Sequence, residues 1–337
     1  MNVALGERIA HPNIRRLDPL RHLRQVADVI EEGFGPDLSH TGRKALREMR
    51  WLSRLGPLLW WLVAASPDFR EYHSGFVWLE GGRVVGTMNI TRPGPFSRRW
   101  FVSNVAVRTA HRGRGIGRTL MQTGLAWAQA QGGEAVFLRV KRSNQAAFSL
   151  YESLGFQALH DAVEFTLDRV PRVRRIPAQS GIEIAPYRRR QWPQVRDLAR
   201  AAIPPDLRWL EAVNVQNFDP ALGQRLAEAW TDLTTGQTVE RWVASRGERV
   251  VAALSIQIAR QRGVHTLGLH VHPEHRGQVE EALLSQAMVR LWPFCEQTTA
   301  IGLPLGDDLV RQTLQRYGFV ARKTLTLMRL WLQDTPR

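Results

Sequence analysis

The stretch VAVRTAHRGRGIGRTL, residues Val105–Leu120, decides how this chain folds. Its first residues are apolar and predict a strand that ends near Val107, and the pattern downstream predicts a helix over Ile116–Gln131. Between them lies a loop in which glycines alternate with arginines. Glycine lets a backbone approach a ligand closely, and the free N–H groups of a helix's first turn attract negative charge. The sequence therefore predicts a loop that binds an anion such as a pyrophosphate.

The dinucleotide-binding fingerprint G-x-G-x-x-G is the alternative that the glycines raise. Here Gly113, Gly115 and Gly117 run G-x-G-x-G, and the position that should hold a further glycine is Arg118. The fingerprint also needs an acidic residue about 20 positions further on, after a second strand. Residues 135–140 read AVFLRV and provide none. This alternative is therefore disfavoured.

The stretch instead resembles the signature of the GCN5-related N-acetyltransferase (GNAT) family, [RQ]-x-x-G-x-[GA], with Arg112, Gly115 and Gly117 at the matching positions. Residues 150–156, LYESLGF, are similar to the family's L-Y-x-x-x-G-F, and Asn144 begins the helix before them. The resemblance implies an α/β (α+β) fold, in which a mixed, mostly antiparallel twisted sheet is flanked by helices. It also implies acetyl-CoA as co-substrate and direct transfer of the acetyl group to a primary amine.

The same resemblance assigns roles to individual residues. Tyr151 matches the acid that protonates the departing CoA thiolate, a step that a phenol can perform. Asn144 matches a position that contacts the cofactor or caps the last helix. The backbone near Val105 is expected to bind the pantetheine arm and to polarise the thioester carbonyl. The full set expected to bind acetyl-CoA is Val105, Ala106, Val107, Arg112, Gly113, Arg114, Gly115, Ile116, Gly117, Arg118 and Asn144.

The general base stays open at this point. The strand WFVSNVAV, residues 100–107, has no carboxylate where family members often carry one. Glu32, Glu71 and His73 lie in regions that form the acceptor side in the family, and water is the remaining candidate. The acceptor itself, a small-molecule amine or a peptide N-terminus, cannot be read from the sequence.

Three blocks of sequence recur in the same order at nearly constant offsets. The offset is 166 for RVVG and RVVA, 164 for the loop block and 163 for LGF and YGF; the blocks begin at residues 83 and 249, 105 and 269, and 154 and 317. The chain therefore looks like two copies of one domain. We expect a catalytic domain over 1–170, a linker over 171–180 and a second, degenerate domain over 181–337.

The second copy keeps Arg276 and Gly277 at the positions of Arg112 and Gly113 but differs at the later loop positions and in the last helix. Val279, Glu280 and Glu281 replace Gly115, Ile116 and Gly117, while Asp307 replaces Asn144 and Leu314 replaces Tyr151. Two carboxylates at a helix start repel a pyrophosphate. We therefore expect the second copy to act as scaffold or as a wall of the acceptor site, without binding acetyl-CoA.

Four histidines gather in the second copy: His265, His270, His272 and His275. His270 and His272 share one face of a strand because side chains alternate along it. No third ligand stands at a fixed spacing, so the sequence favours polar strand and turn positions over a metal site.

Composition limits the remaining function classes. The 337 residues carry a net charge of +15, and 43 of the 46 basic residues are arginines. Such an excess is compatible with nucleic acid or a phosphorylated cofactor. The basic residues lack the interleaved aromatics of a single-strand binder, so nucleic acid is disfavoured. A non-catalytic module that binds acyl-CoA or nucleic acid remains the alternative function.

The sequence gives no sign of a membrane span or a disulfide. Its most apolar run, residues 57–65, is far shorter than the ~20 residues that cross a bilayer. The basic amphipathic stretch 43–65 is interpreted as a helix on the core or a lid, with membrane-surface contact as the alternative. One cysteine, Cys295, suits the cytoplasm. A monomer or homodimer is expected.

Overall fold

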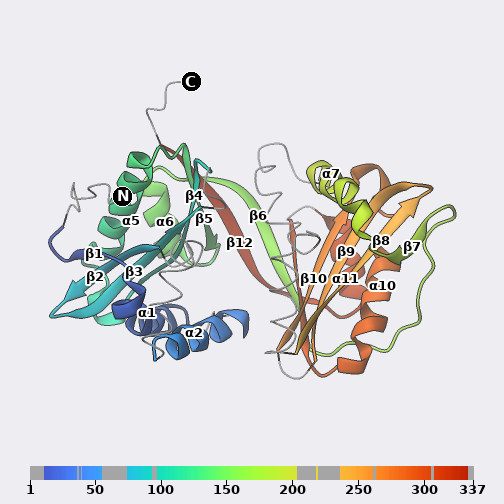
Figure 1. Ribbon diagram of the computed structural model, residues 1–337, viewed down its shortest axis with the longest axis horizontal. Coiled ribbons are helices and arrows are strands. Elements are labelled where there is room, and N and C mark those ends of the chain that lie inside the picture. Colours follow the sequence, from blue (N-terminus) through green and yellow to red (C-terminus); the bar gives the residue numbers. More distant parts are fainter. Residues whose placement is uncertain are drawn as a thin grey trace. The chain divides into compact units, whose positions relative to one another are not determined.

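The computed structural model describes residues 11–35, 38, 40–54, 74–92, 97–202, 218, 236–260, 263–304 and 307–332. The chain divides into two compact units (Figure 1). Unit 1 comprises Met1–His160 and Leu325–Arg337, and unit 2 comprises Asp161–Thr324. Each unit has its own apolar core and is described by itself.

Unit 1 is built on a six-stranded mixed sheet of order β1-β2-β3-β4-β5-β12. Its only parallel pair among the described strands is β4–β5, so the sheet is mostly antiparallel. The strands are β1 Ile14–Arg16, β2 Gly75–Glu80, β3 Arg83–Thr91, β4 Arg99–Val107, β5 Ala135–Lys141 and the end of β12 Val320–Trp331.

Helices cover both faces of this sheet. One face carries α1 Pro19–Phe34, and α2 His40–Leu52 packs on α1. The other face carries α5 Ile116–Ala130 and α6 Gln145–Ser153 (Figure 1). The two faces follow from strand alternation, because Met88 of β3 lies under Gly124 of α5 while Ala106 of β4 lies under Gly33 of α1.

Local chemistry fixes where α1 begins and which side it buries. The Asp18 side chain caps the helix by accepting from the Leu20 N–H at 2.9 Å, and Pro19 occupies the first turn. Leu23, Val26 and Ile30 recur at helical spacing and are buried. The helical spacing of these apolar residues by itself predicts a helix over 20–32, within two residues of each observed end.

Unit 2 repeats the order of elements. Its sheet runs β6-β11-β10-β9-β8-β7. Its strands are β7 Glu183–Pro186, β8 Gln237–Arg246, β9 Arg249–Ala259, β10 Val264–Val271, β11 Thr298–Pro304 and most of β6 Gln157–Leu167. Its helices are α7 Trp192–Ala202, α10 Glu280–Leu291 and α11 Asp308–Arg316. Both units thus have the mixed, mostly antiparallel sheet and flanking helices expected from the sequence.

The last strand of each copy pairs with the other copy's sheet. In unit 1, β12 lies antiparallel to β5, with Met328 opposite Leu138. In unit 2, β6 lies antiparallel to β11, with Phe165 opposite Ile301. The division therefore passes through both strands, and the expected linker 171–180 lies inside unit 2.

The expected linker packs on α10. The Ile176 N–H donates to Ser285 Oγ at 2.9 Å, and the Arg175 guanidinium donates to Gln286. The segment expected as a linker is therefore packed on the surface of unit 2.

The apolar stretch 57–65 lies outside the described residues. Of the amphipathic stretch before it, α2 is described and ends at Leu52. No helix in the described part of the chain has the length and apolar character that a membrane span requires.

Gly75 and Gly302 give a matched test of how tightly the unit 1 sheet is packed. A Cβ built on Gly75 would lie 2.2 Å from the Met88 carbonyl oxygen, which is backbone and cannot rotate away. A Cβ on Gly302, also in a strand, would meet no atom within 4 Å. We expect Gly75→Ala to lower the free energy of unfolding by about 2–3 kcal/mol. Gly302→Ala should stay within about 0.5 kcal/mol of wild type. Chemical denaturation followed by tryptophan fluorescence measures both, and equal losses would contradict the close approach at Gly75.

Candidate functional site

Strands β4 and β5 part halfway along their length. They pair in parallel from Arg99 and Ala135 to Val102 and Leu138, and no pairing follows although β4 continues to Val107. On its other side β4 stays paired with β3 to its end. The second half of β4 therefore has a backbone edge that faces a gap instead of a strand.

A β-bulge in β4 marks this gap. Thr87 of β3 pairs with Ala106, and Asn89 pairs with Ser103, so Asn104 and Val105 stand opposite a single β3 residue. Asn104 has a φ of 52°, the only positive value of a non-glycine residue in the described chain. Asparagine tolerates this left-handed conformation better than most residues. The bulge turns the backbone of Val105, the residue expected to face the thioester.

The loop after β4 has the geometry of an anion site. Gly113 and Gly115 have φ values of 76° and 77°, and a Cβ on either would meet no atom within 4 Å. Gly115 is the N-cap of α5 without a side-chain cap, and the first turn has no acidic residue. Helix bonding starts with the Thr119 N–H donating to the Gly115 carbonyl. The N–H groups of the helix's first turn consequently remain available to a ligand.

Gly117 differs from the other two loop glycines. Its Cβ would lie 3.8 Å from both Leu150 and Val107, which is ordinary van der Waals contact. The loop therefore requires glycine at 113 and 115 for conformation, whereas at 117 a small residue would fit. Ile116, between Gly115 and Gly117, is 2% exposed and anchors the start of the helix in the core.

Each arginine of the loop has a partner within the unit. Arg114 forms a two-pronged ion pair with Glu80 of β2, at 2.8 and 3.2 Å. Arg118 donates to Ser153 Oγ at 2.7 Å, and Arg112 Nε donates to the Val107 carbonyl at 3.2 Å. The Arg114 bond lowers the pKa of Glu80, with a smaller contribution from the Trp78 indole. Sequence reasoning missed Glu80, which lies far from the loop in the chain and carries no motif.

Tyr151 is buried beside the apolar core of unit 1. Its side chain is 7% exposed and lies near the Phe156 ring, with centroids 6.0 Å apart. Burial raises the pKa of Tyr151 to about 12. Its hydroxyl makes no hydrogen bond with any described residue. The phenol is thus protonated at neutral pH and has a proton to give.

Asn144 caps α6. Its side-chain oxygen accepts from the Ala147 N–H at 3.1 Å, so one of its two expected roles is present without a ligand. Its counterpart in unit 2, Asp307, has the N-cap position of α11 but no side-chain cap bond.

Of the three side chains considered as general base, only Glu32 is described; Glu71 and His73 lie outside the described residues. Glu32 accepts from the Thr109 N–H at 2.7 Å and pairs with Arg108 at 2.8 Å. The Thr109 bond is the main reason that the pKa of Glu32 is lowered. A carboxylate held in this way is a weak base, and its geometry fastens α1 to the end of β4.

The matching loop of unit 2 is filled by its own side chain. Glu280 is 3% exposed, and its carboxylate accepts from the Gly277 N–H at 2.9 Å and from the Val279 N–H at 3.2 Å. Gly277 keeps the left-handed conformation, with a φ of 81°. The loop of unit 2 thus keeps a nest, that is, a group of backbone N–H groups that point toward one acceptor. A carboxylate of the chain itself occupies the place that an external anion would take.

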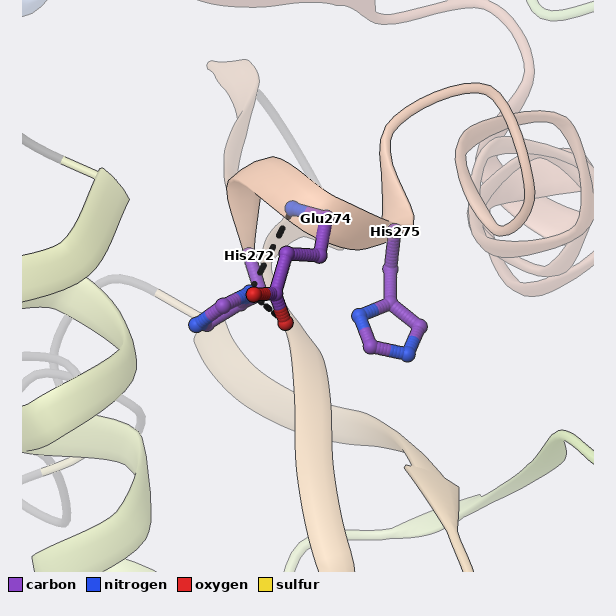
Figure 2. A group of neighbouring side chains, drawn as sticks. All are labelled: His272, Glu274 and His275. Atoms are coloured by element: carbon purple, nitrogen blue, oxygen red, sulfur yellow. Dashed lines mark hydrogen bonds and ion pairs between the residues drawn. The ribbon is translucent and has the colours of Figure 1, made fainter.

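The histidines of unit 2 separate into a core residue and a surface cluster. His265 is fully buried and bonded to the Ala259 N–H and the Phe294 carbonyl. Figure 2 shows His272, Glu274 and His275 side by side, with ligand atoms within 4.8 Å of one another. The structure thus places a carboxylate, Glu274, beside two of the histidines, whereas the sequence spacing indicated no third ligand.

A basic residue, Arg249, contacts two members of this cluster. Its guanidinium lies 3.1 Å from His272 Nε2 and 3.9 Å from the Glu274 carboxylate. The Arg249 guanidinium therefore balances the charge of the Glu274 carboxylate and also contacts the His272 imidazole. These three side chains form a network on the turn after β10.

Comparisons with known proteins point to one family. Residues 43–156 match the family model described as "Acetyltransferase (GNAT) family". The chain is 37% identical over 102 residues to the N-alpha-acetyltransferase RimI of Mycobacterium tuberculosis, a match that covers 29% of this chain and 61% of RimI. It is 33% identical over 90 residues to the mycothiol acetyltransferase of Corynebacterium glutamicum, covering 27% of this chain and 30% of that protein.

Solved structures extend the likeness to nearly the whole chain. A GCN5-related N-acetyltransferase from Sphaerobacter thermophilus superposes with a TM-score of 0.66 at 15% identity, over 97% of this chain and 98% of that one. A tandem GNAT protein from the clavulanic acid biosynthesis pathway gives 0.52 at 15% identity, over 78% and 84% of the two chains. The chain therefore has the GNAT fold.

Two substitutions at Gly115 separate backbone strain from charge at the loop. Gly115→Ala introduces only a side chain in the left-handed conformation, while Gly115→Glu adds the carboxylate that unit 2 carries nearby. We expect calorimetric titration with acetyl-CoA to give an affinity several-fold weaker for the alanine variant. The glutamate variant should bind at least about 100-fold more weakly because its charge opposes the pyrophosphate. Equal affinities for wild type and the glutamate variant, with unchanged melting temperatures, would rule out the loop as the pyrophosphate site.

Proposed function

Because residues 43–156 match the GNAT acetyltransferase family model and the chain has the GNAT fold, we propose that the protein is an acetyl-CoA-dependent N-acetyltransferase whose active site lies in unit 1. The observation that carries the proposal is the combination of an open glycine nest at the start of α5 with a buried, protonated tyrosine on α6, whose neighbour Leu150 lies against Gly117 of the loop. Both belong to the matched segment.

The gap accounts for binding of the co-substrate. The free N–H groups of the loop and of the first turn of α5 would hold the pyrophosphate, with Arg112 and Arg118 close by. The unpaired edge of β4, around Val105 and Val107, would bond to the pantetheine amides as an added strand does. This binding mode uses backbone groups, so it tolerates the ion pair that already engages Arg114.

The chemistry is a direct transfer. The lone pair of a neutral amine attacks the thioester carbonyl, and the new C–N bond forms as the C–S bond breaks. An N–H group near Val105 would stabilise the oxyanion. The Tyr151 hydroxyl gives its proton to the thiolate, and the proton lost by the amine returns through water to the phenolate. The products are an acetamide and coenzyme A.

Water is the base that this arrangement favours. Ser103 and Asn104, on β4 at the gap, are exposed and cannot accept a proton as a carboxylate does. Glu32 is engaged by Arg108 and Thr109. A fraction of the acceptor amine molecules is already neutral before binding. Such an amine loses one further proton after its attack, and water can accept that proton.

Unit 2 is proposed to bind no acetyl-CoA. Glu280 already accepts from the N–H groups that a pyrophosphate would need. Leu314, at the position of Tyr151, is fully buried and has no proton to donate. Unit 2 would serve as scaffold.

A non-catalytic acyl-CoA binder is the second candidate, favoured by the absence of a carboxylate on β4. Release of free thiol from acetyl-CoA with a panel of primary amines decides between the two. Binding of acetyl-CoA without thiol release from any amine would support the binder. Affinity for nucleic acid that falls steeply with salt would instead indicate the nucleic-acid module.

Tyr151→Phe tests the acid role. We expect kcat to fall about 100-fold because the thiolate loses its proton donor. The matched control is Tyr317→Phe, which removes the hydroxyl of a tyrosine in unit 2 and should leave kcat within about two-fold of wild type. A wild-type value of kcat for Tyr151→Phe, with chemistry rate-limiting, would remove the role.

The pH profile follows from the raised pKa of Tyr151. A phenol with a pKa of about 12 stays protonated throughout the ordinary range. Wild-type kcat should therefore rise with pH as the acceptor amine loses its proton, and show no descending limb below about pH 10. A descending limb near pH 8 in wild type that disappears in Tyr151→Phe would contradict the assignment.

A further inference from the structure

Three neighbouring strands of unit 1 place polar residues in one row at the mouth of the gap. Asn89 of β3 is the Cα partner of Ser103 of β4. Ser103 of β4 and Arg139 of β5 directly follow the last parallel pair, Val102 and Leu138, so each begins the parted segment of its strand. Asn89, Ser103 and Arg139 thus mark the start of the gap on three neighbouring strands.

This row is on the face that carries α1. Thr87, two residues before Asn89, pairs with Ala106, which lies against Gly33 of α1. On β5, Leu138 belongs to the core under α5, so its neighbour Arg139 points to the opposite face. The pyrophosphate loop opens α5, which covers the other face. An acceptor would therefore meet the thioester from the side of the row.

Arg139 is a cation without a partner. Its side chain forms no hydrogen bond or ion pair with any described residue. It is exposed to solvent, yet the surrounding protein desolvates the guanidinium enough to lower its pKa.

Asn89 brings an unmet hydrogen-bond acceptor to the same row. The residue is 6% exposed, and its buried Oδ1 has no partner among the described residues. Thr87, fully buried on the same strand face, has an Oγ1 that likewise bonds to no residue the structure describes. Buried polar side-chain atoms are satisfied in the large majority of cases, so two neighbouring exceptions indicate a place where a ligand supplies the missing donor.

The face around the row is positively charged. The strand positions of β4, β5 and β12 on this face include no acidic residue and carry the cations Arg99, Arg139, Lys141 and Arg329. Arg329 lies over the Trp331 ring at 4.6 Å, and its buried Nε has no partner. Among the described carboxylates, Glu32 of α1 is already held by Arg108. A polycationic amine would be repelled here.

We propose that the acceptor is an amine that also carries an anionic group, a carboxylate or a phosphate, which Arg139 binds while Asn89 and Ser103 orient the amine toward the thioester. This inference rests on the proposed function and specifies its substrate class. The planar guanidinium offers two parallel N–H donors to such a group. The Asn89 Oδ1 accepts a hydrogen bond from an N–H group of the amine. The lone pair of the amine nitrogen stays free to attack the thioester.

Matched pairs of amines test the proposal through release of coenzyme A. The anionic members are phenylalanine and O-phosphoethanolamine, the neutral members are phenylalaninamide and ethanolamine, and spermidine is the polycation. We expect kcat/KM to be tens of times higher for at least one anionic member than for its neutral partner. Arg139→Gln should lower kcat/KM for that member about 30-fold and leave the neutral partner within about two-fold. Arg24→Gln, which removes an exposed arginine from α1, should change neither.

The outcomes separate this inference from the proposed function. Thiol release without preference for anionic amines, or a preference that Arg139→Gln leaves intact, would overturn the inference and keep the acetyltransferase. Absence of thiol release with every amine would count against the proposed function.

A binding measurement then tests, without the reaction taking place, whether the row binds the anionic group. The N-acetyl derivatives of the preferred anionic amine and of its neutral partner are titrated into the protein saturated with coenzyme A, for wild type and Arg139→Gln. Tighter binding of the anionic derivative that the variant abolishes supports the row. Equal binding of the two, or none, refutes it, provided that the variant melts at the wild-type temperature.

Discussion

The parting of β4 from β5 is the constraint on which the rest of unit 1 depends. Two parallel strands normally satisfy each other's backbone groups along their length. Here the pairing ends at Val102 and Leu138, and the bulge with Asn104 in a left-handed conformation turns β4 away. The cost is an unsatisfied backbone edge in the folded unit, which a substrate with amide groups can satisfy. The proposed site for acetyl-CoA and the incomplete strand pairing are therefore the same feature.

The parted strand is held in place by contacts from outside the sheet. Glu32 ties α1 to Thr109 and Arg108 directly after β4, and Glu80 ties β2 to Arg114 in the loop. These carboxylates reduce the positive charge around the loop. What attracts an anion is then chiefly the set of backbone N–H groups at the start of α5, a fixed and directional source of positive potential. The large arginine excess of the chain is thus a poor guide to the site.

How much the sequence could predict depends on the range of the interactions. The loop, the start of α5 and the cap at Asn144 follow from local chemistry, and all were predicted within a residue or two. The exchange of β6 and β12 could not be predicted, because both copies have the same apolar alternation and either strand satisfies either edge. The same holds for Glu80, whose partner is 34 positions away, and for Arg139, whose neighbours depend on strand register.

Unit 2 supplies an internal comparison for the chemistry of the loop. Gly277 has nearly the same left-handed φ as Gly113, so the backbone kept its shape after the sequence around it changed. Backbone N–H groups that point into such a loop without an acceptor would cost free energy, because they lose their hydrogen bonds to water. The Glu280 carboxylate supplies the acceptor in unit 2. An anion is therefore what this backbone requires in both units. In unit 2 the chain provides it, and the scaffold is complete without a ligand. In unit 1 no carboxylate of α5 reaches the nest, and completing it is left to a substrate that carries its own negative charge.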